Sequence, residues 1–365
     1  KIIGKKDAYE IKYAEHPYLR AHLYSIQAEA DIVPAYKIES AEEMATTVDR
    51  SPLHEEFVNK HLTDFQRDQV RLLKYFLRLH DLYGAEVFTS GFSGYLCELL
   101  IYQFGDLASV LKFFANSKPP ILLNPKAREI AKDENLVKKF NSQFVVIDPV
   151  DENRNVAAAV SMESLSKFVV LARILLERPS LKEFLAKGFS HSEAKRWLSD
   201  FQKRTGYALR IIRIKLPEKS EDILWPQLRK VTDEAKTLAE QAGFLIPIAL
   251  PVEKDTTGMI VLFIEKWNQK IRFVRGPSVF LKEASDRFIN KHKKSIGILF
   301  KEDVLYALET PAFTDIDSFL KNLLKRSKKH NDIILSKGRI LKKIPNDCVD
   351  DVYAEMRKRF GIGLY

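Results

Sequence analysis

The stretch FQRDQVRLLKYFLRL, residues 65–79, predicts an amphipathic helix. Its apolar side is formed at helical spacing by Val70, Leu73, Phe76 and Leu77. Its opposite side carries a row of four cations: Arg67, Arg71, Lys74 and Arg78. Few acids compensate this row, which favours a groove for phosphates, although a solvated helix face is the more common arrangement.

A glycine-containing turn follows this helix and opens a second apolar segment. Gly91-Phe92-Ser93-Gly94 precedes residues 95–104, which predict another helix. The N–H groups of a helix N-terminus and the Ser93 hydroxyl can together hold a phosphate. The turn is not a P-loop, because no Gly-Lys-Ser/Thr follows it, and most turns of this kind only redirect the chain.

A single aspartate stands in the strand predicted at residues 28–34, which read AEADIVP. An unpaired carboxylate is costly to bury. Asp31 therefore has two interpretations of equal weight. It is either a ligand for a hard divalent cation at the rim of a sheet, or a carboxylate on a solvated face.

A polar cluster, DPVDENRN at residues 148–155, comes directly after an apolar strand predicted at residues 144–147. Within it, Arg154 offers a planar fork of five donors that suits a base edge or a phosphate. The alternative is a capped loop with no binding role.

The second half of the chain has a different pattern. A β-rich run at residues 207–216 is followed by a long amphipathic helix that ends at Gly243, and then by strands at residues 244–250 and 259–264. This order predicts a small α+β module of the split βαβ or RRM type. Further helices are expected at residues 280–292 and 318–325.

Composition narrows the class of protein. The chain has 365 residues, 45% hydrophobic and 30% charged, which predicts two or three globular domains. Its net charge of +10 favours a polyanionic partner. The two cysteines are too few for a disulfide framework. No stretch is long and apolar enough to span a membrane, so we expect no membrane partner. We therefore expect a cytoplasmic protein.

Six blocks of the first 161 residues resemble one family when they are read in order. They are YAEHPYLRAHL, EADIVPAYKI, TVDRSPLHEEFV, VRLLKYFLRLHDLYGAE, SGFSGYLCELLI and VIDPVDENRNVAAAVS. Together they resemble the archaeal-type CCA-adding enzymes, the class I tRNA nucleotidyltransferases. The resemblance is dense from residue 9 to about residue 178. After residue 190 it depends mainly on the order of elements.

The resemblance implies an activity. These enzymes add C, C and A to the 3′ end of tRNA without a template. They use CTP and ATP and release pyrophosphate. It also implies Mg²⁺, in a two-ion site that three carboxylates normally hold.

The resemblance also implies roles for individual residues. Asp31 matches a catalytic carboxylate that binds metal, and Arg154 matches the arginine that reads the base. His54 matches a contact near the ribose and phosphates, and His16 lies beside the incoming nucleotide. The residues that match those holding the triphosphate are Lys74, Tyr83 and Ser93. The other cations of the row, expected to serve RNA or solvent, are Arg67, Arg71 and Arg78.

One departure from the family concerns the metal ligands. The sequence has no Gly-Ser dipeptide and no acidic pair in a strand before Asp31, so two of the three expected carboxylates have no match. Because the chain starts at Lys1 without Met, we expect that the N-terminal part of the palm was left out. We also expect this chain alone to transfer no nucleotide.

The expected architecture is an α+β multidomain fold. It has a residual nucleotidyltransferase palm (1–57), a largely helical central neck (58–190), an RRM-like tail module that binds tRNA (191–310) and C-terminal elements that pack on the central region (311–365). The palm and the tail would hold the acceptor stem and T arm of tRNA, with a strong dependence on salt.

Two other functions stay open, and so does a homodimer. A poly(A) polymerase-like nucleotidyltransferase would need ATP alone, whereas CCA addition needs CTP as well. A non-catalytic RNA-binding protein on the same scaffold would show no metal dependence.

Overall fold

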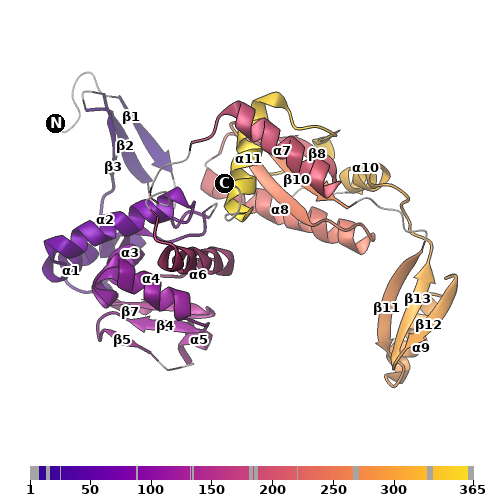
Figure 1. Ribbon diagram of the computed structural model, residues 1–365, viewed down its shortest axis with the longest axis horizontal. Helices are drawn as coiled ribbons and strands as arrows, with labels where there is room; N and C mark the ends of the chain where they lie inside the picture. Colours follow the sequence, from indigo (N-terminus) through magenta and orange to yellow (C-terminus); the bar gives the residue numbers. More distant parts are fainter. Residues whose placement is uncertain are drawn as a thin grey trace. The chain divides into compact units, whose positions relative to one another are not determined.

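The computed structural model describes residues 8–13, 17–24, 26–87, 89–131, 133, 135–180, 184, 188–219, 221–265, 271–326 and 332–360. The chain divides into two compact units, Lys1–Gly188 and Phe189–Tyr365 (Figure 1). Within the described residues, no helix is both long and apolar enough to cross a bilayer.

The described part of the first unit begins with a three-stranded antiparallel sheet, whose third strand lies within the strand predicted at residues 28–34. Its strands are β1 (Ala8–Tyr13), β2 (Pro17–Leu23) and β3 (Ala28–Ile32), in the order β1-β2-β3 (Figure 1). Residues paired across antiparallel strands share a face. The pairs Ile11–Leu19 and Leu19–Ile32 therefore form an apolar face, while Arg20 and Asp31 lie opposite each other on the polar face.

Five longer helices form most of the remainder of this unit. They are α1 (Ser51–His61), α2 (Asp64–Leu79), α3 (Gly94–Phe104), α4 (Leu107–Asn116) and α6 (Met162–Glu177). The 3₁₀ helices η1 (Ala41–Glu43) and η2 (Thr47–Arg50) precede α1. Helix α2 confirms the helix predicted at residues 65–79. A reciprocal capping box between Thr63 and Gln66 starts it, and all four residues of its predicted apolar side are buried.

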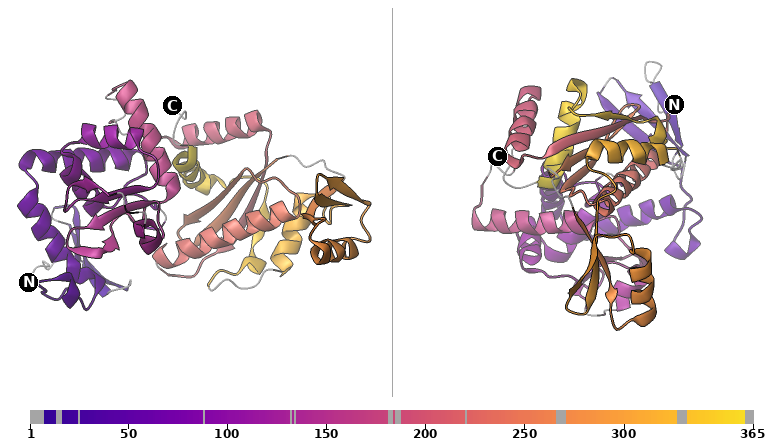
Figure 2. Two further views of the ribbon diagram at one scale, coloured as in Figure 1. Left: turned by 90° about the horizontal axis from the view of Figure 1, so that it is seen from below. Right: turned by 90° about the vertical axis from the view of Figure 1, so that its right-hand side faces the viewer.

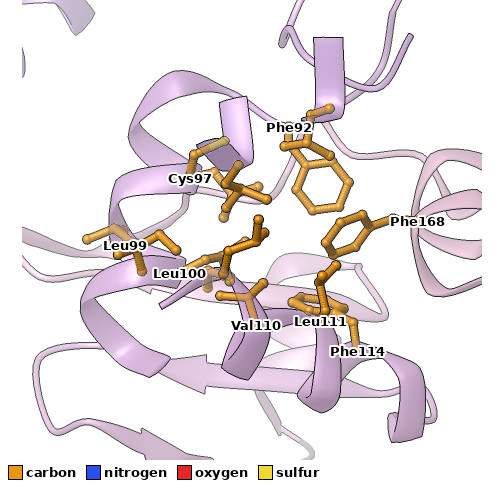
Figure 3. Close-up of a cluster of buried hydrophobic side chains, with 14 of the residues drawn as sticks. Phe92, Cys97, Leu99, Leu100, Val110, Leu111, Phe114 and Phe168 are labelled. Atoms are coloured by element: carbon orange, nitrogen blue, oxygen red, sulfur yellow. The ribbon is translucent and has the colours of Figure 1, made fainter. Parts of the chain in front are cut away.

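The core of the first unit is built around phenylalanine rings. Phe168 of α6 lies 4.9 Å from Phe92 and 5.0 Å from Phe114 between ring centroids (Figure 3). The ring centroid of Phe144 lies 5.7 Å from that of Phe114. Such tilted and edge-on contacts add to the free energy that burial of the rings provides. Phe92 lies two residues before the first residue of α3, so this packing holds the start of α3 against the core.

A small mixed sheet lies in the same unit. Its strands are β4 (Ile121–Asn124), β5 (Glu129–Ile130), β6 (Phe144–Asp148) and β7 (Asp151–Asn155), in the order β5-β4-β6-β7. The short helix α5 (Asn135–Phe140) precedes β6. The residues 148–155 are therefore not a capped loop. They form the end of β6, a tight turn and the strand β7, which places Asp148 opposite Asp151.

The second unit contains a four-stranded antiparallel sheet with helices on both faces (Figure 2). Its strands are β8 (Ala208–Lys215), β9 (Ile248–Lys254), β10 (Thr257–Ile264) and β14 (Arg339–Leu341), in the order β14-β8-β10-β9. Helices α8 (Glu221–Gln241) and α10 (Ile316–Arg326) cover one face. Helices α7 (His191–Thr205) and α11 (Val349–Phe360) cover the other.

The side chains of β8 point alternately to the two faces of the sheet, and each face is covered by its own pair of helices. Ile212 and Ile214 pack with α8 and α10, whereas Leu209 and Ile211 pack with α7 and α11. The predicted strand–helix–strand–strand order is confirmed by β8, α8, β9 and β10. The C-terminal elements were expected to pack on the central region. Within the second unit, β14 pairs with β8, and α10 and α11 lie in its two cores, so the C-terminal elements supply this unit with its fourth strand and two of its helices.

A further three-stranded sheet is inserted between β10 and α10. It consists of β11 (Arg272–Ser278), β12 (Gly297–Lys301) and β13 (Val304–Glu309), in the order β11-β13-β12, with helix α9 (Lys282–Lys291) beside β11. Two short 3₁₀ helices, η4 (Leu335–Lys337) and η5 (Asn346–Cys348), flank β14.

Candidate functional site

The end of β6 places a carboxylate in the interior of the first unit. The Asp148 side chain is 0% exposed. Its Oδ2 accepts hydrogen bonds from His54 Nε2 at 2.9 Å and from Arg154 Nη1 at 2.8 Å. Its Oδ1 accepts from the Tyr95 hydroxyl at 3.1 Å and from the Val150 backbone N–H at 3.1 Å. Asp148 thereby joins α1, α3 and β7 at one point.

The hydrogen bonds to Asp148 outweigh the cost of its burial. Burial alone would raise the pKa of this carboxyl, but the bonds from His54 and Arg154 hold the pKa below its usual range. The pKa of the Tyr95 hydroxyl shifts in the opposite direction. Burial and the adjacent carboxylate raise it far above its usual value. At neutral pH Asp148 is therefore an anion that accepts, and Tyr95 is a phenol that donates.

The first residues of α3 form a second group, next to Tyr95 in the chain. The Ser93 hydroxyl caps the helix by accepting a hydrogen bond from the Leu96 N–H at 3.1 Å. A Cβ placed on Gly94 would lie 3.2 Å from the Tyr83 hydroxyl and 3.5 Å from Lys74 Nζ. The absence of a side chain at Gly94 thus lets both polar groups lie against the start of α3.

Lys74 is held in this position by an acid on α3. Its Nζ donates to Glu98 Oε1 at 2.7 Å, and both side chains are mostly buried. The N-terminus of a helix carries partial positive charge, and an ammonium group beside it adds a full charge. The start of α3 can therefore attract an anion of the size of a phosphate group.

The other cations of the predicted row have different surroundings. Arg78 lies over the ring of Tyr83, with its guanidinium carbon 5.2 Å from the ring centroid. Arg67 donates to the Asn59 side chain at 3.1 Å. Arg71, with 73% of its side chain exposed, pairs with Asp68 one turn earlier on α2. Of the four, Lys74 is the cation that contacts α3.

The segment before α1 is fastened to the same unit by two further acids. Arg50 pairs with Asp151 at 3.2 Å, which ties η2 to β7. Asp49 is buried, and it accepts hydrogen bonds from the backbone N–H groups of Tyr36, Ala45 and Thr46. Although burial raises the pKa of Asp49, these hydrogen bonds lower it below the usual value. The entry into α1, and so the position of His54, is fixed by these contacts.

Asp31 lies on the polar face of the three-stranded sheet. Arg20 donates to both of its carboxylate oxygens, at 2.7 and 2.9 Å, and 43% of the Asp31 side chain is exposed. None of the interactions described above for the residues around α3 involves Asp31. In the part of the chain that the structure describes, no three His, Cys, Asp or Glu side chains form a group that could hold a metal ion.

The residues predicted to bind the nucleotide or the metal therefore fall into three sets. The structure gathers five of them around the start of α3 and the end of β6: His54, Lys74, Tyr83, Ser93 and Arg154. Asp31 belongs to a different sheet of the same unit. His16 lies outside the described residues.

Three residues of the site were not singled out from the sequence. Asp148 follows directly on the buried run FVVI, and a carboxylate at that place is a usable signal. Tyr95 and Glu98 stand one helical turn apart in the apolar segment after Gly94, and Glu98 is the only acid in α3. A lone acid in an apolar helix indicates a charged partner, which here is Lys74.

Two family models match this chain, one in each of its two compact units. The family model described as tRNA nucleotidyltransferase, second domain, matches residues 68–185. The one described as CCA-adding enzyme, C-terminal domain, matches residues 205–333. Among solved structures, a crystal structure of mtPAP in complex with UTP covers 48% of this chain and 47% of that chain, with a TM-score of 0.36 and 12% identity. We draw nothing from so distant a match.

Curated relatives match most of the chain. The CCA-adding enzyme of Methanocaldococcus jannaschii is 35% identical over 324 residues, which are 87% of this chain and 69% of that protein. The CCA-adding enzyme of Sulfolobus acidocaldarius is 35% identical over 87% of this chain and 71% of that protein. The CCA-adding enzyme of Methanothermobacter thermautotrophicus is 31% identical over 96% of this chain and 75% of that protein. With such identity over more than two thirds of each relative, the chain belongs to the family of CCA-adding enzymes.

Proposed function

We propose that this chain acts in the template-independent addition of C, C and A to the 3′ end of tRNA, with CTP and ATP as substrates and pyrophosphate as product. Membership in the CCA-adding family supports the reaction. The arrangement of polar groups around α3 supports the location of the nucleotide site. The net charge of +10 supports a polyanionic partner such as tRNA.

The triphosphate would bind at the start of α3. Lys74 Nζ and the Tyr83 hydroxyl lie over Gly94, and the Ser93 hydroxyl and the first N–H groups of α3 lie beside them. Phosphate oxygens accept from all of these groups. Glu98 neutralises Lys74 in the absence of a ligand, and the phosphates would take over part of that role.

The base would be read by Arg154. One of its nitrogens is held by Asp148, and about a third of the side chain (34%) is exposed, so other N–H groups of the fork can reach a ligand. Cytosine and adenine each present a ring nitrogen that accepts a hydrogen bond beside their amino group. Uracil and guanine present an N–H at that place, which would face the N–H of arginine. A donor fixed at this position therefore favours C and A over U and G.

Magnesium is the cofactor that the family resemblance implies, but the described residues do not form a site for it. Both oxygens of Asp31 accept from Arg20, and no group of three ligands is present among the residues that are described. We expect this chain alone not to extend tRNA, because its sequence offers no match for the other two carboxylates. Extension of a tRNA that lacks its CCA end by the purified chain would contradict that expectation.

The observation that carries the proposal is the placement of Lys74, Tyr83 and Arg154 on connected elements around α3. The test is equilibrium binding of the α,β-methylene analogues of CTP, ATP, UTP and GTP, which cannot transfer a nucleotide. Each is measured with and without a tRNA that ends before the CCA.

We expect the CTP and ATP analogues to bind about tenfold more tightly than the other two when tRNA is present. Binding of the ATP analogue alone would indicate a poly(A) polymerase-like protein. Binding of tRNA without any nucleotide would indicate an RNA-binding protein. Either result would overturn the proposal.

A further inference from the structure

Asp148 differs from the other polar groups of the site because it cannot contact a ligand. Its side chain is 0% exposed, and its two oxygens already accept four hydrogen bonds. A buried carboxylate with four donors is fully satisfied. Any effect of Asp148 on a ligand must therefore pass through the residues that donate to it.

The first of these residues is Arg154. The guanidinium group is planar, so a hydrogen bond from Nη1 to Oδ2 at 2.8 Å limits the directions of its remaining N–H groups. Among the residues that the structure describes, Asp148 is the one hydrogen-bond partner of this side chain. Without Asp148, a long side chain that is one third exposed would sample several rotamers. A donor that recognises a ring nitrogen has to be held in a narrow range of directions.

The second is His54. A carboxylate can only accept, so the contact of 2.9 Å between His54 Nε2 and Asp148 Oδ2 requires the hydrogen to be on Nε2. Nδ1 is then the nitrogen left for other contacts. The ring cannot easily turn, because it stacks on Tyr95 with 3.9 Å between ring centroids and 20° between planes. The Tyr95 hydroxyl donates to the same carboxylate, so the Tyr95 ring, on which His54 stacks, is held in place as well.

We infer that Asp148 is a positioning residue that directs the Arg154 guanidinium and fixes the Nε2–H tautomer of His54, and thereby sets the preference for cytosine and adenine. This inference rests on the proposed function. A purely structural anchor for α1, α3 and β7 would alter the binding of all four nucleotides by the same factor. A positioning residue alters the ratio between them.

The test compares Asp148→Asn with the wild-type chain in the nucleotide-binding assay, with tRNA present. Loss of one negative charge changes the attraction of all four triphosphates equally, so the ratio of the dissociation constants for the UTP and CTP analogues is the quantity of interest. We expect this ratio to fall by about tenfold, which removes the preference. Asp317→Asn is the matched control, since it breaks an Asp–Arg pair with Arg210 in the second unit. It should leave the ratio unchanged.

Two results would overturn the inference in this assay. One is a preserved ratio in Asp148→Asn while all four affinities fall together, and the other is an equal fall of the ratio in Asp317→Asn. If the wild-type chain itself shows no preference for the CTP and ATP analogues, the proposed function fails. The role of Asp148 in holding His54 is then tested separately, by measuring which ring nitrogen of His54 carries the hydrogen.

The tautomer of His54 can be measured without a variant of Asp148. The ¹⁵N shifts of the histidine side chains in the wild-type chain report which ring nitrogen carries the hydrogen. The His54 signals are assigned by their loss in His54→Gln. We expect a protonated Nε2 and, in the neutral ring, an unprotonated Nδ1. A neutral ring with its hydrogen on Nδ1 would contradict the role of Asp148 even if Asp148→Asn fails to fold.

Discussion

Two of the aspartate–arginine pairs in the first unit are chemically alike and differ in their surroundings. Arg20 and Asp31 face each other across two strands, and the side chains are 31% and 43% exposed. Arg154 and Asp148 are joined at the end of a buried strand, where Asp148 is fully enclosed and also accepts from His54 and Tyr95. The first pair links β2 to β3, and the second lies where α1, α3, β6 and β7 meet.

The difference shows that burial, more than the identity of the partners, determines what such a pair does. Water screens the charges of an exposed pair, which therefore adds little to stability. An enclosed carboxylate must have its donors in place, because leaving either partner alone in the interior is costly. Asp148 can thus dictate the positions of other side chains, and the exposed pair has much less influence.

The largest expected effect is on the stability of the first unit. Asp148→Ala leaves Arg154, His54 and Tyr95 without their shared acceptor, and we expect a loss of about 3–5 kcal/mol in the free energy of unfolding. Asp31→Ala should cost less than about 1 kcal/mol. Chemical denaturation followed by far-UV circular dichroism measures both.

Tryptophan fluorescence is the internal control for this comparison. All three tryptophans lie after residue 188, in the second unit, so their signal reports that unit. The fluorescence transition should be the same in wild type and in both variants. Equal losses of stability in Asp148→Ala and Asp31→Ala would remove the distinction between the two pairs.

The next effect separates two cations of the same helix. Lys74→Ala should weaken binding of the CTP analogue by at least about tenfold, because it removes the ammonium group at the start of α3. Arg71→Ala removes an exposed cation that pairs with Asp68 on the same helix, and should change binding by less than about twofold. Binding of cytidine, which lacks phosphates, should be insensitive to both. A similar loss of CTP affinity in the two variants would show that only the overall positive charge matters.

A smaller effect follows from the low pKa of the Asp148 carboxyl. An aspartate whose pKa is lower in the folded chain than its ordinary value of about 3.9 contributes stability above that value. This contribution is lost as the pH falls below about 4 and through the folded pKa. The difference in unfolding free energy between wild type and Asp148→Asn should therefore shrink as the pH falls below about 4. A difference that grows as the pH falls has the wrong sign for this account.

The smallest expected effect concerns Glu98, which neutralises Lys74 in the unliganded chain. Glu98→Gln keeps the size of the side chain and removes its negative charge. We expect the CTP analogue to bind up to about threefold more tightly at low salt, with the gain reduced at 0.5 M salt by screening. Weaker binding of the analogue in this variant would mean that Glu98 is needed to hold Lys74 in place.

Much of the fold could be predicted from periodicity. The predicted helix at residues 65–79 corresponds to α2, and the order of β8, α8, β9 and β10 was recognised because each of these elements is long enough to show its period. The strands β14, β4 and β5 have two to four residues, too few for any alternation to appear. For that reason the pairing of β14 with β8 could not be predicted from the sequence.

The candidate site could be predicted only in part, because its contacts join distant residues. Asp148 meets His54 across 94 positions of the chain and Tyr95 across 53. Neither separation leaves a local pattern, so the residue at the centre of the cluster was missed although Arg154, six positions away, was found. The sequence also left two interpretations open for Asp31. Its pairing with Arg20 depends on the register of β2 and β3, which the sequence does not show.

The most direct test of the central claim, that the start of α3 and the β6–β7 turn form one nucleotide site, is hydrogen–deuterium exchange with and without the CTP analogue in the presence of tRNA. We predict that the analogue slows exchange most strongly in peptides covering residues 90–98 and 148–155. Peptides of the second unit serve as the reference for the effect of tRNA alone. Unchanged exchange in both of those segments, together with slower exchange elsewhere in the chain, would contradict the account.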